Sequence, residues 1–298
     1  MYLNNPTFKK YMYEDFEFPF DNITMDEKIS FELERAIVLA VRRCVHNHKK
    51  CALSFSGGLD SSIIAKVLKE IGADFTAYVV GLRGSADIEA AKKTASELKI
   101  ELKIAMLKQE EIAEMIKAVM WITKSDDPIT VSVALVLYAA AREAAKDGYK
   151  HILSGLGSDE IFAGYDSHAK ALLKGWEEVH KECIRRVHHE INKDIVRDVS
   201  ICKNFNIEPM MPFLDIDVVR LAMITHPKLK ISNEHKKLIL RNIAKNLNLP
   251  KDVYERKKKA AQYGSSTDKA LRKTAKQSGF DSIGSYLKSQ LANIYKTK

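Results

Sequence analysis

A segment rich in glycine and serine, SFSGGLDSS at residues 54–62, has the residue types needed to hold a phosphate group. Gly57 and Gly58 would let the backbone approach an anion closely, because glycine has no Cβ atom. Hydroxyl donors come from Ser56, Ser61 and Ser62. The Asp60 carboxylate would repel phosphates unless a cation such as Mg²⁺ lay between them. The segment predicts a metal-assisted phosphate site, and the alternative is an ordinary Gly-Gly turn with a Ser/Asp helix cap.

The elements on either side of this segment must position it. The apolar run Ala52–Phe55 is typical of a buried strand, and Ile63, Ile64, Val67 and Leu68 follow at helical spacing. In such a strand–turn–helix unit, backbone N–H groups at the helix N-terminus face a bound anion. The motif GxxxxGK[ST] does not occur in the chain, so this is not a Walker A loop.

Strands and helices alternate through the first half of the chain. Further strands are expected at Phe75–Val80, Leu102–Met106 and His151–Ser154, and helices at Ile88–Leu98, Glu110–Ile122 and Val131–Ala145. This alternation predicts parallel βαβ units with right-handed crossovers, and hence an α/β fold with a doubly wound sheet.

After Tyr165 the pattern becomes helical throughout. One helical face would carry Trp176, Val179, Cys183, Val187 and Ile191. Further helical stretches are expected at Ile216–Ile224, Lys236–Leu247, Thr267–Lys276 and Ile283–Ile294. Residues 1–30 are expected to form an irregular arm.

Composition sets the broad class of protein. The 298 residues carry a net charge of +9, which allows a polyanionic partner such as RNA without requiring one. We expect no membrane-spanning run and no signal peptide. None of the four cysteines forms a CxxC pair, which argues against a disulfide framework and a structural zinc or iron–sulfur site. We therefore expect a cytoplasmic enzyme.

Four later segments narrow the family: YVVGLRGSAD (78–87), LSGLGSDEIFAGY (153–165), MPFLD (211–215), and the pair HKKLILR (235–241) and RKKKAAQYG (256–264). Segment 54–62 resembles the PP-loop of ATP pyrophosphatases. With it, these segments resemble the synthetase domain of asparagine synthetase in order and approximate spacing. The resemblance covers about residues 30–265.

The resemblance implies a fold and a division of the chain. The fold would be α/β, with a doubly wound, mostly parallel five-stranded sheet of the HUP/PP-loop type and a helical C-terminal region. After the arm at 1–30, residues 31–298 would form the synthetase-like domain. Its nucleotide-binding α/β part would be 31–165, and its mainly helical part 166–298.

The resemblance also assigns site residues. Asp60 and Asp159 would share one Mg²⁺ on the pyrophosphate of ATP. Lys258 would be the catalytic lysine near the α-phosphate, with Lys257 or Lys259 as alternatives if the alignment slips by one. The adenine pocket would be lined by Phe55, Val80, Ser154 and Gly155, although Phe55 and Val80 could equally be plain core.

Two more basic residues, Lys237 and Arg241, are spaced i, i+4 on an expected helix. They could hold phosphate or pair with acids. Glu160 is expected to cap the helix that follows Asp159.

The chain departs from the family pattern at two positions. Leu156 stands where the family motif GEGSDE has its first glutamate, and Met210 stands where an arginine precedes PFLD. A leucine cannot accept a proton or bind ammonium. Both changes put the substrate in doubt but leave the adenylation residues in place.

The expected activity is that of an AMP-forming amide ligase using ATP and Mg²⁺. It would adenylate a carboxylate such as aspartate, release pyrophosphate and form an amide with ammonia. The chain enters the synthetase region within about 30 residues, without a glutaminase domain, so ammonia would be free or come from a separate glutamine amidotransferase subunit. A homo-oligomer is compatible with this interpretation. The alternatives are a PP-loop ligase that modifies tRNA and a non-catalytic subunit that keeps the fold.

Overall fold

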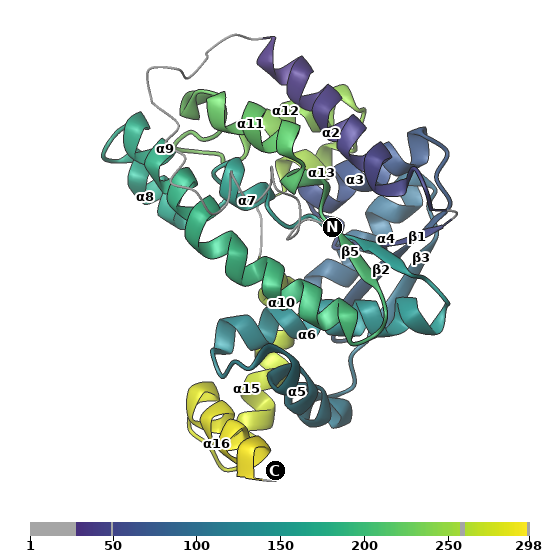
Figure 1. Cartoon of the computed structure of the whole chain (residues 1–298), viewed down its shortest axis with the longest axis vertical. Coiled ribbons are helices and arrows are strands. Elements are labelled where there is room, and N and C mark those ends of the chain that lie inside the picture. Colours follow the sequence, from purple (N-terminus) through teal and green to yellow (C-terminus); the bar gives the residue numbers. More distant parts are fainter. Residues whose placement is uncertain (1–27, 49, 257–259, 297–298) are drawn as a thin grey trace.

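A five-stranded, all-parallel sheet lies within the residues that the computed structural model describes, namely 28–48, 50–256 and 260–296 (Figure 1). Its strands are β1 (Cys51–Ser54), β2 (Phe75–Gly81), β3 (Leu102–Met106), β4 (His151–Leu153) and β5 (Glu208–Met210). The order β3-β2-β1-β4-β5 confirms the expected α/β fold with a doubly wound sheet.

The strand order reverses between β1 and β4. From β1 the chain steps outward to β2 and β3, and then returns to place β4 on the other side of β1. Ligands of open α/β sheets bind beyond the carboxyl ends of the strands at such a switch point. The segments that follow β1 and β4 are the PP-loop and the SGLGSDE turn, so the topology brings both to one edge.

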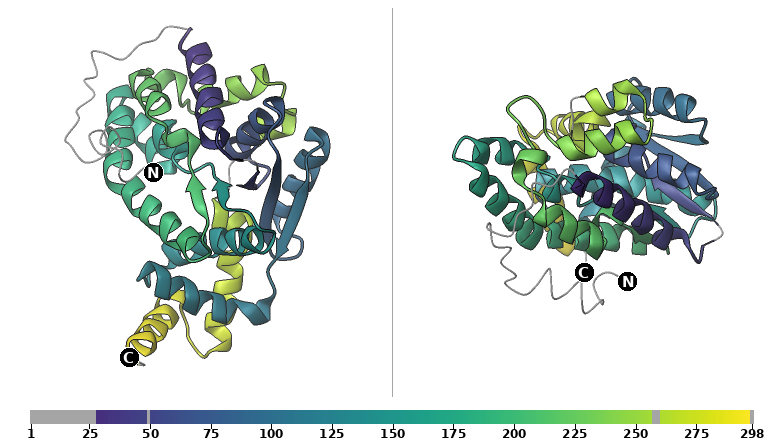
Figure 2. Two further views of the ribbon diagram at one scale, coloured as in Figure 1. Left: turned by 45° about the vertical axis from the view of Figure 1, so that its right-hand side comes forward. Right: turned by 90° about the horizontal axis from the view of Figure 1, so that it is seen from above.

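Alternation along the strands gives the sheet two buried faces. Leu53, Val79 and Leu153 belong to one core, and Ala52 and Ile152 belong to the other. Helices cover both faces (Figure 2). The first half of the chain contributes α2 (Ile29–Val45), α3 (Leu59–Glu70), α4 (Ala86–Leu98), α5 (Gln109–Thr123) and α6 (Pro128–Lys146).

The second half is mainly helical. Its α-helices are α7 (Ser158–Ile161), α8 (Asp166–Leu172), α9 (Trp176–Arg185), α10 (Ile191–Lys203), α11 (Ile216–Ile224), α12 (Leu238–Asn246), α13 (Lys251–Glu255), α14 (Ala261–Gly264), α15 (Thr267–Gln277) and α16 (Ile283–Lys296). Short 3₁₀ turns occur at Pro212–Leu214 and Pro227–Leu229, and a π-helical turn at Arg186–Glu190 joins α9 to α10. In Figure 1, α15 and α16 lie with α5 at one end of the molecule.

The expectation of an all-helical second half is wrong at one element. β5 comes from that half and pairs with β4. It is only three residues long and contains Pro209, so it shows no alternation from which a strand could be predicted. An edge strand tolerates the proline because one side of its backbone needs no ladder partner.

Helix α6 is long and apolar enough by composition to cross a membrane, contrary to expectation. It packs against β2, α5 and α10, and ten of its residues are buried. These contacts are those of a core helix. Of the expected arm at 1–30, only residues 28–30 are described, and α2 already begins at Ile29.

Candidate active site

The predicted glycine turn joins β1 to α3. Gly57 has a φ of +64°, and a Cβ atom there would lie 2.6 Å from backbone atoms of Ala90 and Ala91 in α4. Glycine alone suits this position, since both the φ and the contact exclude a side chain. Gly58, the N-cap of α3, is less constrained, with its Cβ position 3.1 Å from Ser56 Oγ. Gly57 thus packs the turn on α4, and Gly58 opens α3.

The three predicted serines occupy different places. Ser61 Oγ accepts a bond from Ser56 N at 3.3 Å and donates to Gly58 O at 3.3 Å, and both serines line cavities. Ser62 is fully buried, and its Oγ has no hydrogen-bond partner among the described residues. Ser56 and Ser61 can therefore reach a ligand at this turn, whereas Ser62 lies behind it.

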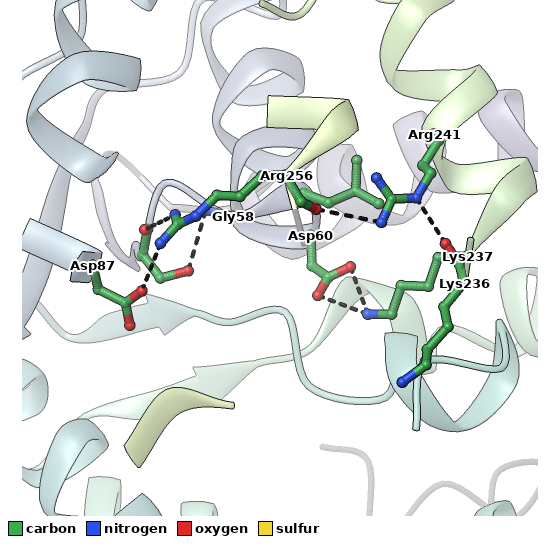
Figure 3. Close-up of a pocket in the computed structure, with 10 residues that line it drawn as sticks. Gly58, Asp60, Asp87, Lys236, Lys237, Arg241 and Arg256 are labelled. Carbon is green, nitrogen blue, oxygen red and sulfur yellow. Dashed lines mark hydrogen bonds and ion pairs between the residues drawn. The ribbon is translucent and has the colours of Figure 1, made fainter. Parts of the chain in front are cut away.

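Two cavities lie side by side at this edge and share Ser56, Asp60 and Asp87. The first, of about 550 Å³ including space open to solvent, is shown in Figure 3. Its lining is largely charged: Ser56, Gly58, Leu59, Asp60, Asp87, Gly164, Lys236, Lys237, Arg241 and Arg256. The second, of about 730 Å³, is lined by Ser54, Phe55, Ser56, Asp60, Ser61, Tyr78, Val79, Val80, Asp87, Val136, Gly155 and Ala261. The first cavity is therefore the charged end of the site, and the second cavity is its largely apolar end.

Three of the four residues predicted for the adenine pocket line the second cavity, namely Phe55, Val80 and Gly155. Phe55 and Val80 are only 2% and 4% exposed, so each also belongs to the core. The fourth, Ser154, instead ties β4 to β5, with its backbone N–H donating to Met210 O at 2.9 Å.

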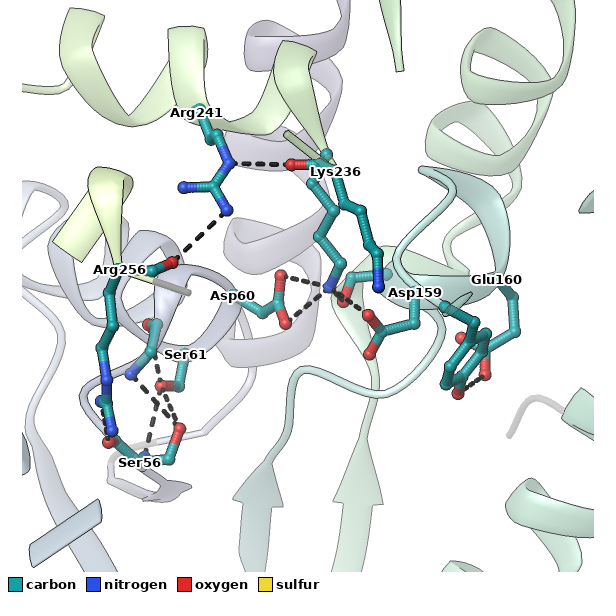
Figure 4. A network of polar contacts seen from close by, with 12 residues as sticks. Ser56, Asp60, Ser61, Asp159, Glu160, Lys236, Arg241 and Arg256 are labelled. Atoms are coloured by element: carbon teal, nitrogen blue, oxygen red, sulfur yellow. Dashed lines mark hydrogen bonds and ion pairs between the residues drawn. The ribbon is translucent and has the colours of Figure 1, made fainter. Parts of the chain in front are cut away.

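The charged end is organised around Lys237, which is labelled in Figure 3; Figure 4 labels Asp60 and Asp159 of the same cluster. The Lys237 Nζ lies 2.8 Å from both carboxylate oxygens of Asp60, 2.8 Å from Asp159 Oδ1 and 2.9 Å from Ser158 Oγ. Burial lowers the pKa of Lys237, and the Asp60 carboxylate opposes that shift. The carboxylates of Asp60 and Asp159, both at 2.8 Å, favour the ammonium form of the side chain. The two predicted metal ligands are thus brought together with a lysine between them.

Two glycines leave the room that this cluster occupies. A Cβ atom on Gly164 would lie 1.9 Å from Asp159 Oδ1 and 2.5 Å from Lys237 Cε. A Cβ atom on Gly155 would lie 2.9 Å from the Cβ of Asp60. Any larger residue at Gly164 would displace the two charged side chains.

The two carboxylates are ligands of the kind that Mg²⁺ prefers, but they are too few to complete its coordination. Asp60 and Asp159 supply the hard carboxylate oxygens that Mg²⁺ prefers. No group of three or more His, Cys, Asp or Glu side chains that could hold a metal occurs among the described residues. Mg²⁺ commonly binds through one or two carboxylates together with phosphate oxygens and water, so the residues fit a metal that nucleotide phosphates help to hold.

Lys237 and Arg241 do not share a helix face, contrary to expectation. Lys237 precedes α12 with a left-handed φ of 57°, and the helix begins at Leu238. Arg241 turns to the backbone: its Nε donates to Lys236 O at 2.8 Å, and its Nη groups donate to the carbonyl oxygens of Tyr254 and Arg256. Lys237 therefore pairs with acids, and Arg241 fastens the end of α13.

Arg256 and Asp87 are site residues that the sequence analysis did not single out. The Arg256 guanidinium donates to Ser56 O at 3.5 Å and to Ala86 O at 3.3 Å. It also donates to Asp87 Oδ1 at 3.3 Å (Figure 3). It thereby links the PP-loop to the start of α4. The signal was present, because Asp87 ends the segment YVVGLRGSAD and Arg256 begins RKKKAAQYG.

Lys258 and its alternatives, Lys257 and Lys259, lie outside the described residues. The flanking Arg256 and Ala261 line the first and second cavities, respectively. The role of Lys258 stays a prediction.

Within the SGLGSDE turn, Glu160 is buried and Leu156 is half-buried. Glu160 accepts a hydrogen bond from the Tyr165 hydroxyl at 2.6 Å, and burial raises the pKa of its carboxyl group. Leu156 packs against the core, and Met210 is 3% exposed. The two departures from the family pattern are thus apolar side chains in contact with the core.

Comparisons of the sequence with known proteins identify the family to which the chain is similar. The family model described as asparagine synthase matches residues 32–176 and 166–296. A putative glutamine-hydrolysing asparagine synthetase of Methanocaldococcus jannaschii is 31% identical over 281 residues, which is 83% of this chain and 52% of that protein. Asparagine synthetase B of Escherichia coli is 28% identical over 243 residues, covering 76% of this chain and 43% of that protein. The chain spans about half the length of these relatives.

Proposed function

Since the chain belongs to the asparagine synthase family, we propose that it is an ATP-dependent carbon–nitrogen ligase that adenylates a carboxylate and then forms an amide. One observation carries the proposal: a glycine turn, two facing carboxylates and an apolar cavity meet at the switch point of the sheet. This is the arrangement needed to bind a nucleotide by its base at one end and by its phosphates at the other.

In the first step, a carboxylate oxygen of the substrate attacks the α-phosphorus of ATP. A new P–O bond forms, the bond from the α-phosphorus to the bridging oxygen breaks, and pyrophosphate leaves. The N-terminus of α3 and the serines of the turn would bind the phosphates. Mg²⁺, held by Asp60 and Asp159, would neutralise phosphate charge when bound. Lys258 would stabilise the charge that builds on the transition state.

In the second step, ammonia attacks the acyl carbon of the adenylate. The acyl–oxygen bond to AMP breaks, AMP leaves, and the nitrogen loses a proton to give the amide. Leu156 cannot take that proton, so another base or the leaving AMP must. Aspartate or an analogue would be the acceptor, and ammonia would be free or supplied by a separate amidotransferase subunit.

The test is exchange of labelled pyrophosphate into ATP, measured with a panel of amino acids and other carboxylates. We expect aspartate or a close analogue to support exchange. Asp60→Asn should abolish it by removing one metal ligand, whereas Asp217→Asn, an exposed acid on α11 paired with Arg43, should leave it unchanged. If no carboxylate supports exchange, or if Asp60→Asn retains full activity, the proposal fails.

A further inference from the structure

Lys237 occupies the position between Asp60 and Asp159 where a shared metal ion would bind. Its Nζ contacts three carboxylate oxygens at 2.8 Å, and the residue is 3% exposed. The left-handed backbone at Lys237 is uncommon for a residue with a side chain, and here it accompanies burial of the side chain in the site.

The ammonium group and a divalent ion compete for the same oxygens. Mg²⁺ binds carboxylate oxygens at about 2.0–2.1 Å in a demanding octahedral geometry, which leaves no room for Nζ among them. The two acids carry a charge of −2 and the lysine +1, so the cluster without a metal has a charge of only −1. A free metal ion would have to displace a cation that is already in contact with both carboxylates.

A nucleotide changes this balance. Lys237 lines the first cavity itself, next to the PP-loop residues Ser56 and Gly58. Phosphates bound there would present several negative charges within reach of the flexible lysine side chain. They would also supply the oxygen ligands that two carboxylates alone do not provide.

We propose that Lys237 is the resident cation of the metal site: it keeps divalent ions out of the nucleotide-free protein, and it transfers to phosphate when the metal enters with the nucleotide. The inference rests on the proposed function for the identity of the ligand. It assigns Lys237 as a positioning residue that makes metal binding depend on nucleotide binding.

The adjacent lysine provides a matched control. Lys236 also lines the first cavity, but its Nζ pairs with the exposed carboxylate of Asp166 rather than with Asp60 or Asp159. Substitution of Lys236 removes one positive charge from the same cavity while leaving the resident cation in place.

The experiment measures Mn²⁺ binding by electron paramagnetic resonance, with and without α,β-methylene-ATP, which cannot be cleaved at the reacting bond. We expect wild-type protein and Lys236→Met to bind Mn²⁺ weakly without nucleotide. Lys237→Met should bind Mn²⁺ at least about tenfold more tightly than the wild type does. A factor of this size is within the usual range of coupling between two groups that compete for one site. The double variant Asp60→Asn/Lys237→Met should lose that gain.

Equal Mn²⁺ affinity of wild type and Lys237→Met in the absence of nucleotide would overturn the inference. Lys237→Gln, which removes the charge but can still donate hydrogen bonds to Asp60, replaces the methionine variant if that one does not fold. The readout needs no turnover. Absence of pyrophosphate exchange would therefore reject the proposed function without affecting the Mn²⁺ result. Equal Mn²⁺ affinities would reject the role of Lys237 without affecting the proposed function.

Discussion

At the scale of single residues, Lys230 is a buried lysine that lines neither of the two cavities described above. This side chain is fully buried, and its Nζ has no hydrogen-bond partner among the described residues. Burial lowers the pKa of its amine. The unfolded chain keeps that proton up to about pH 10.4, so the unfolded state binds more protons than the folded state below that pH. The free energy of unfolding therefore rises with pH as the native pKa is passed.

We predict that Lys230→Met stabilises the protein at pH 7 by about 1–3 kcal/mol, because it removes an uncompensated polar group from the core. The gain should shrink as the pH rises toward 10, because the stability of the wild type increases above the lowered native pKa, and it should level off where the unfolded chain also loses the proton. Urea denaturation at both pH values measures it, with the exposed Lys228→Met as the control. A destabilised Lys230→Met would show that the amine has a stabilising partner.

Gly164 supports a second prediction at this scale. In Gly164→Ala the new methyl group would collide with Asp159 Oδ1 and Lys237 Cε. We expect pyrophosphate exchange to fall at least about tenfold, and overpacking to cost about 1–3 kcal/mol of stability. Gly284→Ala in α16 is the control, since a Cβ atom there meets nothing within 4 Å. Unchanged exchange in Gly164→Ala would mean that Asp159 and Lys237 can move without loss of activity.

The resemblance to the family placed Asp60 and Asp159 at one site, and the topology is consistent with that placement because both follow strands of a parallel sheet. Spacing in the sequence could not decide whether Lys237 binds phosphate or pairs with acids. Two residues spaced i, i+4 share a helix face only if both lie within the helix. Lys237 instead precedes α12 and has a positive φ. That backbone state depends on tertiary packing, which a local pattern does not contain.

At the scale of elements, α12 and α13 are fastened to each other by Arg241. Its guanidinium reaches the carbonyl oxygens of Tyr254 and Arg256, just before the lysine run at 257–259. We predict that Arg241→Met lowers kcat for exchange at least about tenfold with a smaller change in KM for ATP. The reason is that it would disturb the placement of Lys258, the proposed catalytic lysine, more than it would disturb nucleotide binding.

Limited trypsin digestion checks the same variant independently, since cleavage after Arg256 should become faster. Arg272→Met is the control, because Arg272 is exposed and pairs with Asp268 on its own helix. If Arg241→Met raised only KM, Arg241 would instead act on the bound nucleotide.

Elements with long periodic patterns were predictable, and short ones were not. The expected strand at Phe75–Val80 and helix at Val131–Ala145 agree with β2 and α6 to within a few residues. β5 was missed because three residues cannot show alternation, and its place is determined by pairing with β4. The π-helical turn at Arg186–Glu190 likewise interrupts what looks like one continuous helical face.

At the scale of the whole molecule, nucleotide binding should couple to global stability. A ligand that binds only the folded state at a hundred times its Kd adds about 2.7 kcal/mol. For a chain of 298 residues, an unfolding entropy of about 2.1 cal/mol/K per residue converts this into a rise in Tm of roughly 4 °C. We predict such a rise with α,β-methylene-ATP and Mg²⁺, measured by calorimetry, and little or none in Asp60→Asn. An equal rise in the Tm of Asp60→Asn would show that the nucleotide binds without the metal ligand Asp60.

The contact between Asp60 and Lys237 joins positions 177 residues apart in the chain. While the protein is being synthesised, the PP-loop and the SGLGSDE turn leave the ribosome well before α12. N-terminal parts of a chain generally fold first, so a nascent α/β half would hold the two facing carboxylates before Lys237 has been made. The charged cluster of the binding site would therefore be completed only at a late stage of translation, when Lys237 is added to the two carboxylates.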